Sequence, residues 1–170
     1  MRLLFALVIL AGTAWFAAPE ARQRLLAALR EDRAGAPAAP AGGAQGDGWN
    51  SITVASDEGG HFLVEATVNG VGVTFLVDSG ASAVVLSPED ARRAGYRPSQ
   101  LRFTGAASTA NGDVRLAPVS LRELRVGQLS LRGLPAVVNE APMPVSLLGM
   151  SFLNRLEAWE AKRDRLVLYW

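Results

Sequence analysis

The sequence predicts an all-β domain with one or two short helices, preceded by an N-terminal hydrophobic helix. From residue 61 onwards, short runs of alternating apolar residues recur, which is typical of half-buried strands. An Asn-Gly pair at residues 69–70 joins two of these runs, and only two short stretches carry helix signals. The 170 residues suffice for one such domain with an N-terminal appendage.

The first two strands form a predicted hairpin. Residues 61–68 (HFLVEATV) place alternate apolar side chains on one face, and residues 71–77 (VGVTFLV) return with the same alternation. Asn69-Gly70 between them favours a type I′ turn, which needs positive φ at both central positions.

A short helix is expected to begin at Ser87-Pro88-Glu89-Asp90. Ser87 suits the N-cap, Pro88 the first helical position and the acids the first turn, while Gly95 suits the C-terminal end. A second short helix is expected near 150–156, and Ser151 is interpreted as its N-cap.

The remaining strands are expected near residues 114–119, 121–126, 129–132, 135–138, 156–161 and 165–170. The last of these is apolar, and two interpretations stay open for it. Residues 165–170 either join a sheet between two subunits or form an edge strand within one subunit.

The N-terminal segment differs from the domain. Residues 3–18 are uncharged and, as a helix of about 1.5 Å per residue, would reach roughly 24 Å, slightly less than a bilayer core. Trp15 and Phe16 follow the small residues that a cleavage site would use, so an uncleaved anchor over residues 1–19 is favoured. Residues 20–48 are expected to form a juxtamembrane helix and an Ala/Pro/Gly linker, followed by the folded domain at 49–170.

Composition excludes several classes of function. The chain has no cysteine, which excludes disulfides, thiolate metal sites and Cys nucleophiles. Its one histidine, His61, cannot build a metal site of several imidazoles within one chain, and no metal site is expected. Seventeen basic and sixteen acidic residues leave a net charge of +1, without the basic excess of a nucleic-acid-binding protein.

The candidate chemistry lies at residues 75–82 (FLVDSGAS). Asp78 follows three apolar residues, where a charge is costly unless a partner or a reaction uses it, and Gly80 permits a tight turn. Alone, the Asp-Ser-Gly tripeptide is more typical of a β-turn in which Asp caps nearby amides than of a catalytic site.

Two later segments change this interpretation. Residues 108–112 (STANG) lie between runs of strand character and are expected to form a hairpin tip. Residues 146–150 (SLLGM) precede a short helix, and Gly149 after two apolar residues suits a strand that passes through a crowded centre.

In this order the motifs resemble the retropepsin-like aspartic proteases, clan AA, and more closely their bacterial membrane-anchored branch. The resemblance spans roughly residues 58–170. It is carried by the stretches GHFLVEATVNG (60–70), FLVDSGAS (75–82), LSPEDARRAG (86–95), STANG (108–112) and SLLGMSFLNRLEAWE (146–160).

The resemblance implies a half-pepsin closed β-barrel that works as a homodimer, with Asp78 as the catalytic residue of each chain. Ser79 stands where many family members have Thr. The expected support of the catalytic loop comes from Ser79, Gly80, Ala81, Leu148 and Gly149. The expected substrate-binding flap is Ser108, Thr109, Ala110, Asn111 and Gly112.

The expected function is therefore an aspartic endopeptidase that cleaves protein or peptide substrates without a cofactor. Two alternatives are a membrane-anchored peptide-binding or assembly domain with little hydrolysis, and a small β-barrel without a pocket. The resemblance implies a single-pass inner-membrane protein with a periplasmic domain, whereas the arginines that follow residues 3–18 favour the opposite orientation.

Overall fold

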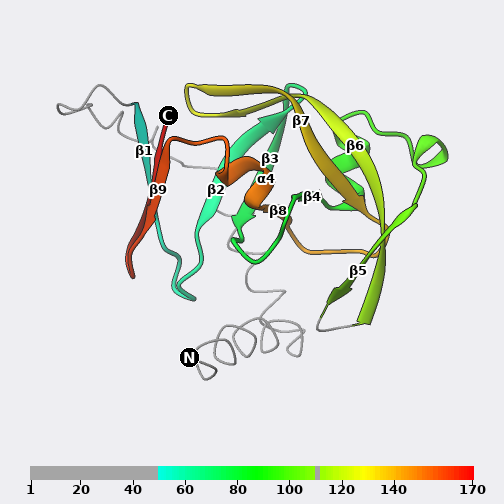
Figure 1. Ribbon diagram of the computed structural model, residues 1–170, viewed down its shortest axis with the longest axis horizontal. Helices are drawn as coiled ribbons and strands as arrows, with labels where there is room; N and C mark the ends of the chain where they lie inside the picture. The colour runs from blue at the N-terminus through cyan, green and yellow to red at the C-terminus, as the bar shows by residue number, and fades with distance from the viewer. Residues whose placement is uncertain (1–49, 110–111) are drawn as a thin grey trace, which may run out of the picture. The chain divides into compact units, whose positions relative to one another are not determined.

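The computed structural model describes residues 50–109 and 112–170 (Figure 1). The anchor expected at residues 1–19 and the segment expected at 20–48 lie outside the described residues. Among the described helices, none combines the length and the apolar character needed to cross a membrane.

Most of the domain is one sheet that closes on itself. The strands follow the order β2-β3-β8-β4-β7-β6-β5, and β2 also pairs with β6, so six strands form a closed barrel with β5 outside the ring. These strands are β2 (Leu63–Val68), β3 (Val71–Val77), β4 (Val84–Leu86), β5 (Gly105–Thr109), β6 (Gly112–Val126), β7 (Leu129–Asn139) and β8 (Ser146–Leu148). The predicted all-β class is confirmed.

The β2–β3 hairpin forms as its sequence predicts. Asn69 and Gly70 have φ of 54° and 86°, and the strands pair from Val68 with Val71 outwards. The Asn69 side chain also donates to the carbonyl oxygen of Ala94 at 3.0 Å, which ties the turn to the C-terminal end of the helix α3 (Pro88–Arg93).

The strands β6 and β7 are longer than the sequence suggests. The predicted strands at 114–119 and 121–126 are one strand, and those at 129–132 and 135–138 are another. Their antiparallel register keeps one alignment from Leu116 opposite Asn139 to Val126 opposite Leu129, with a single gap between the Leu121–Leu134 and Glu123–Arg132 pairs. Pairing with a neighbour thus carries both strands through residues whose local propensities suggest breaks.

A second sheet has three strands in the order β1-β10-β9: β1 (Ser51–Ala55), β10 (Arg165–Tyr169) and β9 (Ala158–Ala161). Both neighbours of β10 are antiparallel strands of the same chain. The edge-strand interpretation of residues 165–170 is therefore wrong, because β10 is the central strand. Residues 165–169 also have no open edge for a partner, and the open edges of this sheet belong to β1 and β9.

The helices are short, as predicted. In α3 (Pro88–Arg93) the Ser87 hydroxyl accepts the backbone N–H of Asp90 at 3.0 Å, which confirms Ser87 as the N-cap. A 3-10 turn, η2 (Pro98–Gln100), follows.

The predicted N-cap role of Ser151 is wrong, because Gly149 caps α4 (Met150–Leu153). The Ser151 hydroxyl instead accepts the N–H of Val84 at 2.9 Å and donates to the Pro135 carbonyl at 3.1 Å, so it joins β4 to β7. With Phe152 and Leu153 fully buried, α4 packs on the barrel core.

Candidate active site

Asp78 lies directly after β3, in a tight turn. Its backbone N–H donates to the carbonyl oxygen of Leu148 at 3.2 Å, and its own carbonyl accepts the N–H of Ala81 at 3.2 Å. The Asp78 Oδ1 accepts the N–H of Gly80 at 2.8 Å. The backbone of the turn therefore fixes the orientation of the Asp78 carboxylate. Asp78 is half-buried, and Ser79 and Gly80 beside it are exposed.

The carboxylate also explains the glycine two residues later. A Cβ on Gly80 would lie 3.1 Å from Asp78 Oδ1, which is tighter than ordinary contact. A side chain at residue 80 would thus crowd the acid while lengthening the hydrogen bond that orients it.

Strand β8 supports this turn from the barrel side. It runs parallel to β3, with Leu148 opposite Val77, and antiparallel to β4, with Leu147 opposite Val85. Leu148 is fully buried, so the carbonyl that receives the Asp78 N–H is held within the core.

Gly149 passes through the crowded point that its sequence context predicts. A Cβ there would lie 2.6 Å from the carbonyl oxygen of Ala81. Next to it, the N–H of Met150 donates to that same Ala81 oxygen at 2.8 Å, and the N–H of Ser151 donates to the Ser82 carbonyl at 3.1 Å. The start of α4 is thereby bonded directly to the loop that follows Asp78.

The predicted flap residues form the ends of two strands. Ser108 and Thr109 end β5, and Gly112 begins β6 with a φ of 105°. The Thr109 hydroxyl donates to the Gly112 carbonyl at 2.8 Å. Ala110 and Asn111 lie outside the described residues, and the role of residues 108–112 as a flap stays a prediction.

No group of three or more His, Cys, Asp or Glu side chains could hold a metal ion in residues 50–109 and 112–170. The Ser130 hydroxyl lowers the pKa of Glu123, helped by Arg125 and Arg132 and opposed by desolvation. Glu123 lies on β6, in the barrel wall, and none of its hydrogen-bond partners belongs to the Asp78 turn.

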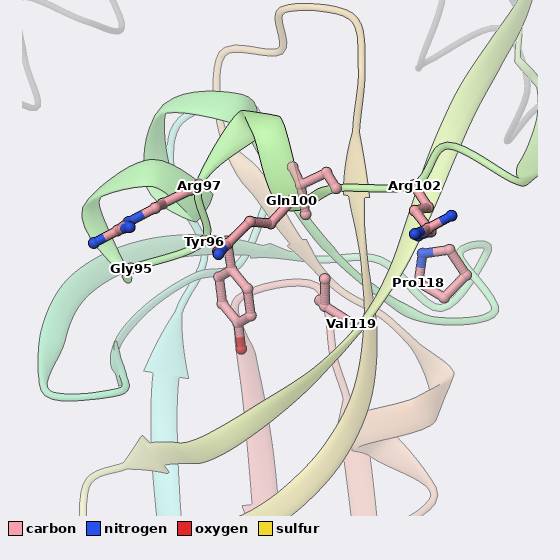
Figure 2. Close-up of a pocket in the computed structure, with 8 residues that line it drawn as sticks. Gly95, Tyr96, Arg97, Gln100, Arg102, Pro118 and Val119 are labelled. Carbon is pink, nitrogen blue, oxygen red and sulfur yellow. The ribbon is translucent and has the colours of Figure 1, made fainter.

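An open pocket of about 240 Å³ lies elsewhere on the barrel (Figure 2). In Figure 2 the Tyr96 ring, Gln100 and Val119 lie between Arg97 and Arg102. None of its lining residues belongs to the Asp78 turn, to β8 or to α4. This pocket is therefore not the candidate active site.

Sequence reasoning missed two serines that support the site. Ser146 is completely buried in β8 and bonded to α3, and Ser151 joins β4 to β7. A signal was present for Ser146, because a hydroxyl within an apolar run needs a buried partner.

The pattern of the site and the fold recurs in known proteins. Residues 64–155 match the model of a family described as "gag-polyprotein putative aspartyl protease". The chain belongs to the retropepsin-like aspartyl protease family.

Two solved structures are similar to the chain. A crystal structure of a retropepsin-like aspartic protease from Rickettsia conorii is 35% identical, with a TM-score of 0.66 over 70% of this chain and 98% of that one. The EIAV protease in complex with the inhibitor HBY-793 shares the fold at 20% identity, with a TM-score of 0.50 over 60% of this chain and 93% of that one.

An uncharacterized protein encoded in the cobV 5′ region of Sinorhizobium sp. is 39% identical over 123 residues, which are 72% of this chain and 53% of that protein. The chain spans about half the length of the curated relatives that it matches.

Proposed function

We propose that the chain is an aspartic endopeptidase whose active site forms from the Asp78 carboxylates of two copies. The observation that carries this proposal is the Asp78 turn, where Gly80 donates to Oδ1 and the loop is bonded to β8 and α4. Such a turn holds an acid in a fixed, partly exposed position, which a general acid or base requires. The family membership supports the same chemistry.

The mechanism needs two carboxylates. Two such groups about 3 Å apart share one proton, because both cannot ionise cheaply, and aspartic proteases are the established example. The ionised group takes a proton from a bound water while the protonated group donates to the scissile carbonyl oxygen. Attack by the water gives a tetrahedral diol, and protonation of the leaving amine then breaks the C–N bond.

A homodimer supplies the second carboxylate. The sequence contains a single Asp-Ser-Gly, so one chain cannot form the pair by itself. A two-fold axis beside the exposed Ser79 and Gly80 would bring the two Asp78 turns together. The hydroxyl of Ser79 would then link the two turns, and Gly80 and Ala81 would form the floor of the cleft.

Protein or peptide substrates would bind as extended strands. The backbone of an extended peptide pairs with strand edges, and we assign the covering edge to residues 108–112. Apolar side chains around the cleaved bond are expected, because the residues that lead into the Asp78 turn are themselves apolar.

We also propose that residues 3–18 anchor the protein in the inner membrane, with the protease domain in the periplasm. The uncharged run supports the anchor, while the arginines after it favour a cytoplasmic domain. A C-terminal alkaline phosphatase fusion distinguishes the two, since activity of the fusion requires export. An inactive but expressed fusion would place the domain in the cytoplasm.

The decisive experiment measures cleavage of a mixed peptide library by the full chain in detergent, across mildly acidic pH. Asp78→Asn should abolish cleavage, whereas Asp164→Asn, at an exposed turn acid, should leave it unchanged. Cleavage that survives Asp78→Asn would exclude the mechanism. Peptide binding without cleavage by the wild-type chain would favour the binding or assembly domain instead.

A further inference from the structure

One carboxylate lies at the centre of a hydrogen-bonded network on the helix side of the barrel. The Asp90 Oδ2 accepts from the hydroxyl of Ser87 at 2.9 Å and from the hydroxyl of Ser146 at 2.7 Å. The Ser146 oxygen in turn accepts the backbone N–H of Ser87 at 3.0 Å. Ser146 is completely buried and Ser87 nearly so, so both hydroxyls are satisfied inside the protein.

The other oxygen of Asp90 connects the network to β3. Arg93 Nη1 donates to Asp90 Oδ1 at 2.8 Å, and Arg93 Nη2 donates to the carbonyl of Gly72 at 2.7 Å. Gly72 lies in β3, the strand that ends in the Asp78 turn. The guanidinium thus links one carboxylate on α3 to the backbone of the strand that carries the candidate catalytic acid.

The Ser146 end of the network reaches the Asp78 turn by a short path. Ser146 lies opposite Phe75 in the parallel pair of β8 and β3, and two residues later Leu148 accepts the Asp78 N–H. Two residues of strand span only about 7 Å. A shift of β8 at Ser146 would therefore move the carbonyl to which Asp78 is bonded.

We propose that Asp90 is a positioning residue that fixes β8 against β3 and thereby holds the Asp78 turn in place. Apolar packing between the strands is non-directional, whereas hydrogen bonds to a carboxylate require defined donor positions. Asp90 accepts such bonds from Ser146 of β8, from Ser87 at the β4–α3 junction and from Arg93. Arg93 also donates to a carbonyl of β3. The expected effect of Asp90 on the rate of cleavage rests on the proposed function, whereas its expected effect on the stability of the Asp78 turn does not.

The structural test is hydrogen exchange of the Asp78 amide, followed by NMR on the full chain. Asp90→Asn should speed exchange of this amide roughly tenfold relative to amides of the β6–β7 ladder, as expected when bonds to a charged group are lost. Glu89→Gln, an exposed neighbour on α3, is the matched control and should change nothing. Unchanged exchange at Asp78, or equal acceleration throughout the barrel, would refute the positioning role.

The kinetic test compares the same variants with peptide substrate. Asp90→Asn should lower kcat roughly tenfold with little change in KM, since substrate contacts are retained. Its pH–rate profile should narrow, because two acids held less closely interact less and their apparent pKa values converge. If Asp90→Asn only reduced the amount of folded protein, the rate would fall and the pH–rate profile would keep its width. A lower rate with an unchanged profile would therefore contradict the positioning role of Asp90.

Two further outcomes remain decisive. If the wild-type chain cleaves no peptide, the proposed function fails, while the exchange experiment still tests the role of Asp90. If Asp90→Asn does not fold, Arg93→Gln removes the guanidinium bonds to Asp90 and to the Gly72 carbonyl and keeps the bonds that Asp90 accepts from Ser87 and Ser146. Arg93→Gln should speed Asp78 exchange about threefold, since it loses one part of the network, and no change would overturn the proposal.

Discussion

Gly149 lies against the backbone of Ala83, where a Cβ atom on residue 149 would be 2.2 Å from the Ala83 carbonyl oxygen. No real side chain tolerates that distance, and the obstructing atom is backbone, which cannot rotate away. Gly149→Ala should therefore displace the loop after Asp78 and destabilise the domain by about 1–3 kcal/mol, the usual cost of overpacking.

The measurement is urea unfolding of the full chain, together with peptide cleavage. Gly72→Ala is the control, because a Cβ there meets nothing within 4 Å and the φ is not left-handed. Equal stability of the two alanine variants would contradict the close approach at Gly149.

Mixing wild-type and Asp78→Asn chains tests whether one active site uses two copies. If both carboxylates are needed and subunits mix freely, activity should fall with the square of the wild-type fraction, because only wild-type pairs are active. The two chains are mixed under conditions in which subunits exchange, and the cleavage rate is measured at a constant total concentration of chains. A linear fall would show that each chain works alone.

Ser79→Thr should strengthen the dimer. Ser79 is exposed in the single chain, and the proposed interface would bury the added methyl group once in each subunit. Burying one methyl group contributes about 0.8 kcal/mol of binding free energy. Two methyl groups per dimer therefore correspond to roughly a tenfold lower dissociation constant. Analytical ultracentrifugation measures this constant, and an unchanged value would place Ser79 outside the interface.

Trp159 is the large apolar side chain that stands exposed in the described part of the chain, at 37%, and it lies on the edge strand β9. Edge strands with exposed apolar residues favour pairing with another chain. Trp159→Lys should therefore weaken self-association, and Trp159→Phe should preserve most of it. If Trp159→Lys left the sedimentation coefficient unchanged, β9 would not be the edge that associates, and β1 would be the remaining open edge of this sheet.

Ser130→Ala should raise the pKa of Glu123, because the Ser130 hydroxyl is the main cause of its lowered pKa. Because this pKa is lowered, the ionised Glu123 carboxylate stabilises the folded state. Its contribution to the free energy of unfolding is complete above the ordinary pKa of 4.5 and is lost as pH falls through the lowered pKa. An NMR titration of the Glu123 carboxyl carbon measures this shift. An unchanged midpoint in the alanine variant would assign the effect to Arg125 instead.

Local signals in the sequence predicted the elements that their own residues determine. Asn69-Gly70 determines the first hairpin turn, and Ser87-Pro88 determines the start of α3, since positive φ and N-capping are local properties. Gly149 is an exception, because a glycine after two apolar residues indicated a crowded strand end, although the crowding atoms belong to Ala81 and Ala83, more than sixty positions earlier.

Features that depend on distant partners were not predictable in this way. β4 has only three residues, too few for a periodic pattern, and exists because β7 and β8 pair with it. The position of β10 between β1 and β9 depends on pairing with residues more than one hundred positions earlier. For the same reason, the bond between Asp90 and Ser146 joined two residues that the sequence presents separately.

The closure of the barrel rests on a narrow seam, in which Thr67 and Val68 pair with Arg125 and Leu124. These partners are more than fifty positions apart in the chain, so the entropy of a long loop opposes their meeting. We therefore expect the strands of this seam to pair late in folding. We also expect the barrel to open locally at this seam first when denaturant is added.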